Sequence, residues 1–215
     1  MSRTPQFQLE VVPLVITLLA SVSPVFGQAG DPAVEFLTEP RKTFESAGHA
    51  KAKGVRLQIE YPQSWSAAEG RHPNVVQNLV SADRFSMCII TVRTWGDLGT
   101  LTAADIEEFL TMPGWPQLLF PPPIVVTDAE RVTVDTLPAS VVRATIETEN
   151  VGNRIRQETL NYSLLTPEHY ILFQFSVGDS ADRRAAALQE RFSRFERLFH
   201  QMAATIVIAN TWRDR

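Results

Sequence analysis

The chain has very little cysteine, and its charges are nearly balanced. Cys88 is the single cysteine among 215 residues, so no disulfide can form within the chain. It lies in the run FSMCIITV, where a buried cysteine behaves as a small hydrophobic side chain. Acidic residues outnumber basic ones, 24 to 20, and the net charge of −4 gives no electrostatic footprint for nucleic acid. We therefore exclude a disulfide scaffold and expect no nucleic-acid partner.

The familiar catalytic and metal-binding motifs are also missing. The chain has four histidines, in four different parts of the sequence: His49, His72, His169 and His200. None has the spacing of a metal site, and no glycine-rich phosphate loop occurs. Gly178-Asp179-Ser180 is similar to an esterase nucleophile block, but no Asp-x-x-His follows, so we interpret Asp179 as a helix cap. We predict no cofactor, no metal and no enzymatic activity.

One long apolar run is present, at the start of the sequence. Val11 to Val22 is nearly uninterrupted, Pro24 breaks it, and Gly27 and Ala29 are small, in the order of a secretory signal peptide. Extended to Phe26, the run is still shorter than the roughly 20 apolar residues of a spanning helix. We expect residues 1–27 to be a cleaved signal peptide, a periplasmic or secreted location, and no stable membrane span after cleavage.

The rest of the chain predicts an α+β domain. Residues 28–53 are polar and are expected to be a flexible arm, with a short helix possible from Asp31-Pro32 to Leu37. Periodicity then predicts strands at 54–61, 74–80, 85–94, 124–135, 140–149, 154–165 and 169–177. A helix is expected after Thr102, with Asp105 completing a capping box, and a long helix follows residue 179. The segment 206–210 could finish that helix or add an edge strand.

These elements indicate one domain over residues 54–210. Short hairpin-sized connections favour antiparallel pairing of neighbouring strands. The predicted fold is therefore an antiparallel sheet of six or seven strands packed between helices.

Two groups of residues are candidates for binding. The first lies in the proline-rich segment 112–123, expected to be irregular, and its members are Trp115, Leu118, Leu119 and Phe120. If exposed, they would form a partner surface, and otherwise they cover one end of the sheet. The second is a polar strand face with the members Arg143, Arg154, Arg156 and Glu158. It could be a ligand-binding face, although cross-strand charge pairing explains it adequately. We interpret Tyr61-Pro62 and Trp65 as a pinned turn.

Several strings in the sequence resemble one known family. GVRLQIEYPQSW, GRHPNVVQNLVS, CIITV and LFHQMAATIVI, in this order and around the predicted elements, are similar to the PsbP-like/DcrB-like group. The resemblance covers about residues 50–210 and implies an α/β/α sandwich. It also implies a non-enzymatic accessory or interaction role, and it supplies no active residue to carry over.

We thus expect an exported, non-catalytic accessory protein that contacts an unknown envelope protein or envelope component. One alternative is a small-ligand or lipid-binding module. Another is an enzyme of unknown class whose site is assembled from distant residues. A concave pocket with convergent polar groups and perturbed titration would favour the enzyme, whereas an exposed apolar patch that includes Trp115 and Phe120 would favour a partner surface.

Overall fold

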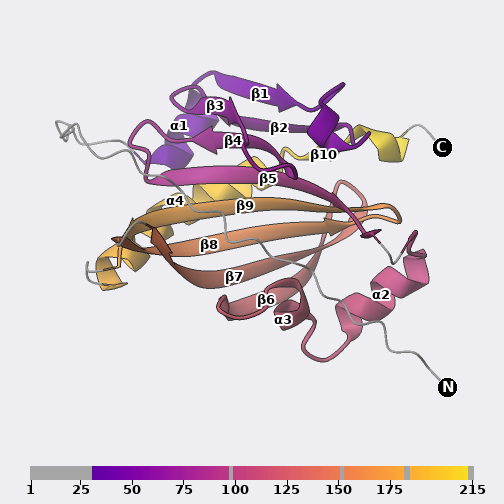
Figure 1. Cartoon of the computed structure of the whole chain (residues 1–215). Coiled ribbons are helices and arrows are strands. Elements are labelled where there is room, and N and C mark those ends of the chain that lie inside the picture. The colour runs from indigo at the N-terminus through magenta and orange to yellow at the C-terminus, as the bar shows by residue number, and fades with distance from the viewer. Residues whose placement is uncertain (1–30, 97–98, 151–152, 182–184, 213–215) are drawn as a thin grey trace.

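A seven-stranded antiparallel sheet forms the centre of the fold (Figure 1). The computed structural model describes residues 31–96, 99–150, 153–181 and 185–212. The strands are β3 (Ser66–Glu69), β4 (Val75–Val80), β5 (Ser86–Thr94), β6 (Val125–Val134), β7 (Leu137–Asn150), β8 (Asn153–Leu165) and β9 (His169–Ser180). Their order in the sheet is β3-β4-β5-β9-β8-β7-β6. Strands β6 to β9 form three successive antiparallel pairs along the chain, and β9 also pairs with the distant β5.

A second, three-stranded antiparallel sheet lies beside the first. It has the order β1-β2-β10 and consists of β1 (Arg41–Glu45), β2 (Leu57–Pro62) and β10 (Val207–Ile208). The strand predicted at 54–61 is therefore not in the main sheet. Of the two expectations for segment 206–210, the edge strand is confirmed, because β10 pairs with β2. A short helix η3 (Ala209–Trp212) follows it.

Residues 31–53 belong to the folded domain, so the expectation of a flexible arm over 28–53 is wrong for this part. They form α1 (Pro32–Thr38), β1 and the one-turn helix η1 (Ala50–Ala52). Asp31 caps α1 by accepting a hydrogen bond from the Ala33 amide at 2.9 Å. The physical reason is burial. Ala33 and Phe36 are buried in the main core, and the free energy gained compensates for the polar composition of the segment. Residues 28–30 lie outside the described residues, as does the predicted signal peptide.

Two sets of helices cover opposite faces of the main sheet. The long helix α4 (Ala185–Ala203) packs its apolar stripe on one face, together with α1 and the small sheet. The helices α2 (Ala103–Thr111) and α3 (Trp115–Leu119) cover only one end of the other face. The predicted α+β class, with an antiparallel sheet between helices, is thus confirmed. We call the surfaces the α4 face and the open face.

Three local predictions meet different outcomes. The capping box of α2 is confirmed, with Thr102 and Asp105 bonded reciprocally. The segment 112–123 is not wholly irregular, because Pro116 lies in the first turn of α3, where a missing N–H costs nothing. The predicted helix cap at Asp179 is not tested, because residues 182–184, just before α4, lie outside the described residues. Asp179 itself lies in β9, where it pairs with Arg156 of β8 because the hairpin ladder continues past the predicted strand end.

The turn from Tyr61 to Trp65 is structural, as interpreted. Both rings are buried in the main core, and the Trp65 amide donates to the Pro62 carbonyl at 3.0 Å. The turn therefore contributes to the packing between the small sheet and the main sheet.

Candidate functional site

The predicted partner surface is not an exposed patch. Leu119 and Phe120 are only 1% and 4% exposed, because they pack under α2 in a second hydrophobic cluster. Trp115 and Leu118 are half-buried against the same cluster. The four side chains therefore cover one end of the sheet, which was the alternative interpretation, and the idea of an exposed apolar surface is wrong for Leu119 and Phe120.

The predicted polar face lies on the α4 face, near its uncovered edge. Arg143 forms an ion pair with Glu196 of α4, and its guanidinium lies 5.3 Å from the centre of the Phe192 ring. Arg154 pairs with Glu147 at 3.0 Å. Glu158 accepts a hydrogen bond from the Thr145 hydroxyl at 3.0 Å, and Arg156 lies 3.7 Å from it. The structure places these charges in pairs within the protein. Arg154–Glu147 is the predicted kind of cross-strand pair, whereas Arg143 pairs with a helix residue and Arg156 lies near Glu158 of its own strand.

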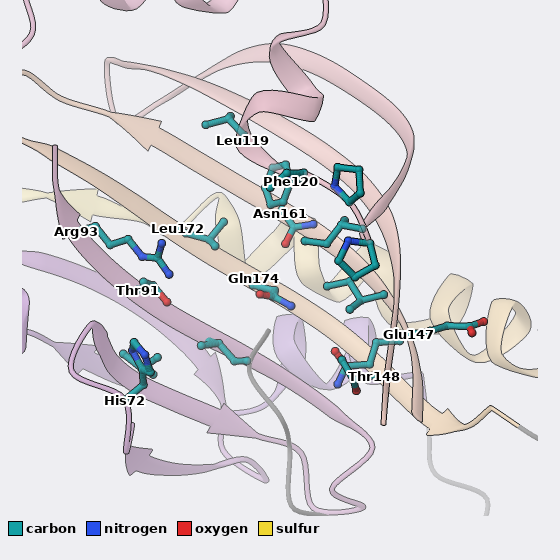
Figure 2. A pocket seen from close by; sticks show the side chains of 18 of the residues that line it. His72, Thr91, Arg93, Leu119, Phe120, Glu147, Thr148, Asn161, Leu172 and Gln174 are labelled. Carbon is teal, nitrogen blue, oxygen red and sulfur yellow. The ribbon is translucent and has the colours of Figure 1, made fainter. Parts of the chain in front are cut away.

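A cavity of about 270 Å³ lies on the open face, where α2 and α3 leave the sheet uncovered (Figure 2). Strands β5, β7, β8 and β9 form its floor, and the segment after α3 forms one wall. Half of its lining residues are apolar: Val75, Ile89, Leu119, Phe120, Pro121, Pro122, Pro123, Ile124, Ile146 and Leu172. Apolar concave surfaces with a few placed polar groups are the usual form of small-molecule sites.

The floor of this pocket carries side-chain amides where a packed sheet would carry apolar groups. Asn161 of β8 lies opposite Gln174 of β9, and Gln157 lies further along β8. Alternation along each strand turns these amides to the open face, whereas Phe173 and Phe175 of β9 point to the α4 face. Figure 2 shows the Asn161 amide below Phe120, close to Leu172 and Gln174. The site is therefore a polar floor under an apolar wall.

Charged groups lie at the ends of the pocket and not on its floor. Arg93 and His72 are at the β5 end, and the carboxylate of Glu147 points away from the cavity (Figure 2). Burial, followed by the charge of Arg93, lowers the pKa of Lys53 beside this end. The lining thus has Arg93 at one end, the acidic residues Glu147 and Glu149 at the β7 end, and neutral side chains between them.

Hydroxyl groups in the pocket are not set up for catalysis. Burial raises the pKa of Tyr170 to about 12, and its hydroxyl pairs with Ser163 at 3.0 Å. His72 accepts a weak hydrogen bond from the Asn74 amide at 3.4 Å. Among the described lining residues, no histidine or carboxylate is hydrogen-bonded to a hydroxyl that it could activate. The arrangement is suited to binding.

Metal and thiol chemistry find no support in the described part of the chain. Within those residues, no three histidine, cysteine or acidic side chains gather as metal ligands would. Cys88 is fully buried, as predicted, and burial raises the pKa of its thiol far above the ordinary value. None of the described helices has the length and apolar character needed to cross a membrane.

Sequence reasoning missed the pocket because its lining comes from several distant elements. One signal was available: Thr91, Asn161 and Gln174 are polar residues inside strands that are otherwise rich in apolar residues. Without the strand order, nothing indicated that they share one face of one sheet.

The comparisons with known proteins concern the fold alone. No family model matches the sequence, and no curated protein matches it. Similar solved structures include cyanobacterial PsbP from Synechocystis sp. PCC 6803, with 14% identity, coverage of 86% of this chain and 99% of that one, and a TM-score of 0.47. LpqN of Mycobacterium tuberculosis, which is involved in cell envelope biogenesis, has 11% identity, coverage of 80% and 94%, and a TM-score of 0.42. A PsbP is thus among the structures that this chain resembles, as the sequence indicates, and the likeness concerns the fold alone.

Proposed function

We propose that this protein is an exported, non-catalytic binding protein that holds a small envelope-associated molecule in the open-face pocket. The observation that carries the proposal is the pocket itself, a cavity of about 270 Å³ with an apolar wall and an amide floor. Of the functions considered from the sequence, we therefore prefer a small-ligand-binding module to a protein that acts through a partner surface. Export rests on the sequence alone, because residues 1–27 lie outside the described residues.

The composition of the lining favours binding over catalysis. Amides and threonine hydroxyls orient a ligand by hydrogen bonds but do not transfer protons near neutral pH. The buried tyrosine at one end, Tyr170, stays protonated because its pKa is about 12. The pocket is concave, as an enzyme site would be. Its described lining residues, however, include no hydrogen-bonded pair of an acid and a base.

The proposal can be tested by filling the pocket. Gln174 is half-buried and its side chain lies in the cavity, so Gln174→Trp places an indole there without touching the α4 face. Thr133→Trp puts the same side chain on the exposed surface of β6 and serves as the matched control. Both variants and the wild type are incubated with native envelope extract, repurified, denatured, and analysed for released small molecules by mass spectrometry.

We expect a molecule that is released by the wild type and by Thr133→Trp but is missing from Gln174→Trp. Equal release from all three proteins, or no release from any of them, would contradict the proposed site. The mass of the released molecule also separates a lipid from a smaller metabolite.

A further inference from the structure

We propose that the open-face pocket selects ligands that present a neutral N–H or O–H donor to Asn161, on an apolar body about the size of one ring. This inference rests on the proposed function and adds the chemical class of the ligand and the residue that selects it. It follows from the orientation of one buried amide, from the hydrogen-bonding capacity beside it, and from the shape of the wall above it.

The orientation of the Asn161 side chain is determined by its partners. Its Nδ2 donates to the Val142 carbonyl at 3.1 Å and to the Thr159 hydroxyl at 2.8 Å. A carbonyl oxygen can only accept, so the NH₂ group must face β7. The Thr159 hydroxyl in turn donates to the Ala144 carbonyl at 2.9 Å, which leaves its oxygen to accept from Asn161. Swapping the amide would break the bond to Val142, and it would keep a bond to Thr159 only if that hydroxyl gave up the Ala144 carbonyl.

The other end of the same amide is an acceptor without a donor. Asn161 is only 1% exposed, and its Oδ1 has no hydrogen-bond partner within the described residues. Buried polar atoms in proteins are normally hydrogen-bonded, and those that are not deserve an explanation. Asn161 lines the pocket, but its Oδ1 is closed to water-sized molecules in the unliganded structure. In our proposal a small shift of the side chains around it lets a ligand donor supply the missing bond, whereas a ligand without a donor would leave the oxygen unsatisfied.

The neighbouring side-chain amides can form hydrogen bonds with other polar atoms of the ligand. Gln174 is the Cα partner of Asn161 across β8 and β9, and Gln157 lies further along β8. No hydrogen bond involves either side chain as placed within the described ranges. An amide can donate or accept, so these two side chains suit a carbonyl or hydroxyl acceptor on the ligand. Only Asn161 is fixed as an acceptor. We therefore expect it to be the group that distinguishes ligands with a hydrogen-bond donor from ligands without one.

The wall opposite these amides suits an apolar body. Phe120, the prolines 121–123 and Ile124 lie above the floor, and none carries a side-chain hydrogen-bonding group. A cavity of about 270 Å³ is slightly below the usual range for ligand sites, which favours a compact ligand over a long acyl chain. An apolar ring with one polar substituent fits both surfaces.

Methylation of a probe tests the donor requirement directly. Benzamide offers N–H donors, whereas N,N-dimethylbenzamide offers none. The isomer 3,5-dimethylbenzamide has the same added bulk and keeps both N–H bonds, so it is the matched control. Each probe is titrated into the mature chain labelled with ¹⁵N, and the shifts of the amide signals of Thr91, Asn161 and Gln174 are followed by NMR.

We expect benzamide and 3,5-dimethylbenzamide to bind with dissociation constants at least tenfold lower than that of N,N-dimethylbenzamide. In Asn161→Leu this preference should disappear, whereas Gln174→Leu should keep it. The wild-type comparison is decisive by itself, even where Asn161→Leu fails to fold. Equal binding of the two dimethyl isomers would overturn the donor requirement and leave the pocket as a ligand site. Binding of no probe, up to the solubility limit, would count against the donor requirement, while the mass-spectrometric comparison decides the proposed function separately.

Discussion

The two faces of the seven-stranded sheet are built on the same strands but differ in how they are packed. On the α4 face, Phe173 and Phe175 of β9 are fully buried, and the Phe175 ring stacks on Phe199 of α4 at 5.2 Å. On the open face, the neighbouring residue Gln174 points into a cavity. Adjacent residues of β9 therefore serve different surroundings. Phe173 and Phe175 belong to the packed interior, whereas Gln174 between them faces a cavity.

In our proposal, one face of the sheet contributes mainly to stability and the other to binding. Aromatic packing without polar atoms gains the most from exclusion of water. The amides of the open face give up part of that gain, as functional sites commonly do. Substitutions on one face should therefore change mainly stability, and those on the other mainly binding.

The largest effect is expected for Phe175→Ala. The side chain is 0% exposed and contacts both Tyr162 and Phe199, so its removal leaves a cavity and should lower the free energy of unfolding by about 3–5 kcal/mol. Urea denaturation measures the change. Leu172→Ala is the control on the open face, where the half-buried side chain should cost clearly less. Equal losses would remove the proposed distinction between the faces.

A smaller loss is expected for Thr102→Ala, at the start of the helix that covers one end of the open face. The hydroxyl of Thr102 accepts from the Asp105 amide at 3.2 Å, and loss of such a cap costs about 0.5–2 kcal/mol. Thermal unfolding measures it. Thr102→Ser keeps the cap and should stay close to the wild type, so a loss as large as that of alanine would show that the hydroxyl is not responsible.

Gln174→Leu should change stability in the opposite direction. Replacing a half-buried amide with an apolar group of similar size should raise the free energy of unfolding by roughly 0.5–1 kcal/mol, while ligand release in the envelope-extract experiment should fall. Gln201→Leu on α4 is a control amide outside the pocket and should leave ligand release unchanged. A destabilised Gln174→Leu would mean that this amide has a structural role.

The smallest effect concerns His200 on α4, whose Nδ1 lies 2.6 Å from the Tyr162 hydroxyl. Burial, followed by the nearby charge of Arg143, lowers the pKa of His200, although the charge of Glu130 opposes this. The folded state therefore disfavours the protonated imidazole, and the unfolded state takes up the proton first as the pH falls. This contribution is present above the unfolded pKa of about 6.5 and decreases as the pH falls below it.

We therefore expect the wild type to lose slightly more stability than His200→Gln between pH 7.5 and pH 5.5, measured by urea denaturation at both values. The comparison with His200→Gln cancels the titration of the other histidines. Identical losses in the two proteins would show that His200 does not contribute.

Local patterns in the sequence predicted the elements well, but not their arrangement in space. Alternation identified most of the strands, although not β1 or β3, and Thr102 with Asp105 identified the start of α2. Both signals depend on neighbours along the chain. Phe36 was placed in a flexible arm, and the burial of Phe120 was left open between two alternatives, because the surroundings of both residues come from distant segments. The pocket was missed for the same reason, since Asn161 and Gln174 become neighbours of the wall only after the sheet has formed.

The pairing of β5 with β9 has a consequence for how the chain acquires its site. Strands β6 to β9 can form by successive hairpins, which are local and fast. The ladder that joins Ile89 to Gln174 must close a loop that contains most of the intervening chain, and such contacts form slowly. The pocket needs strands from both parts of the sheet, β5 on one side and β7 to β9 on the other. The proposed ligand would therefore bind only the completed topology and would stabilise that state alone.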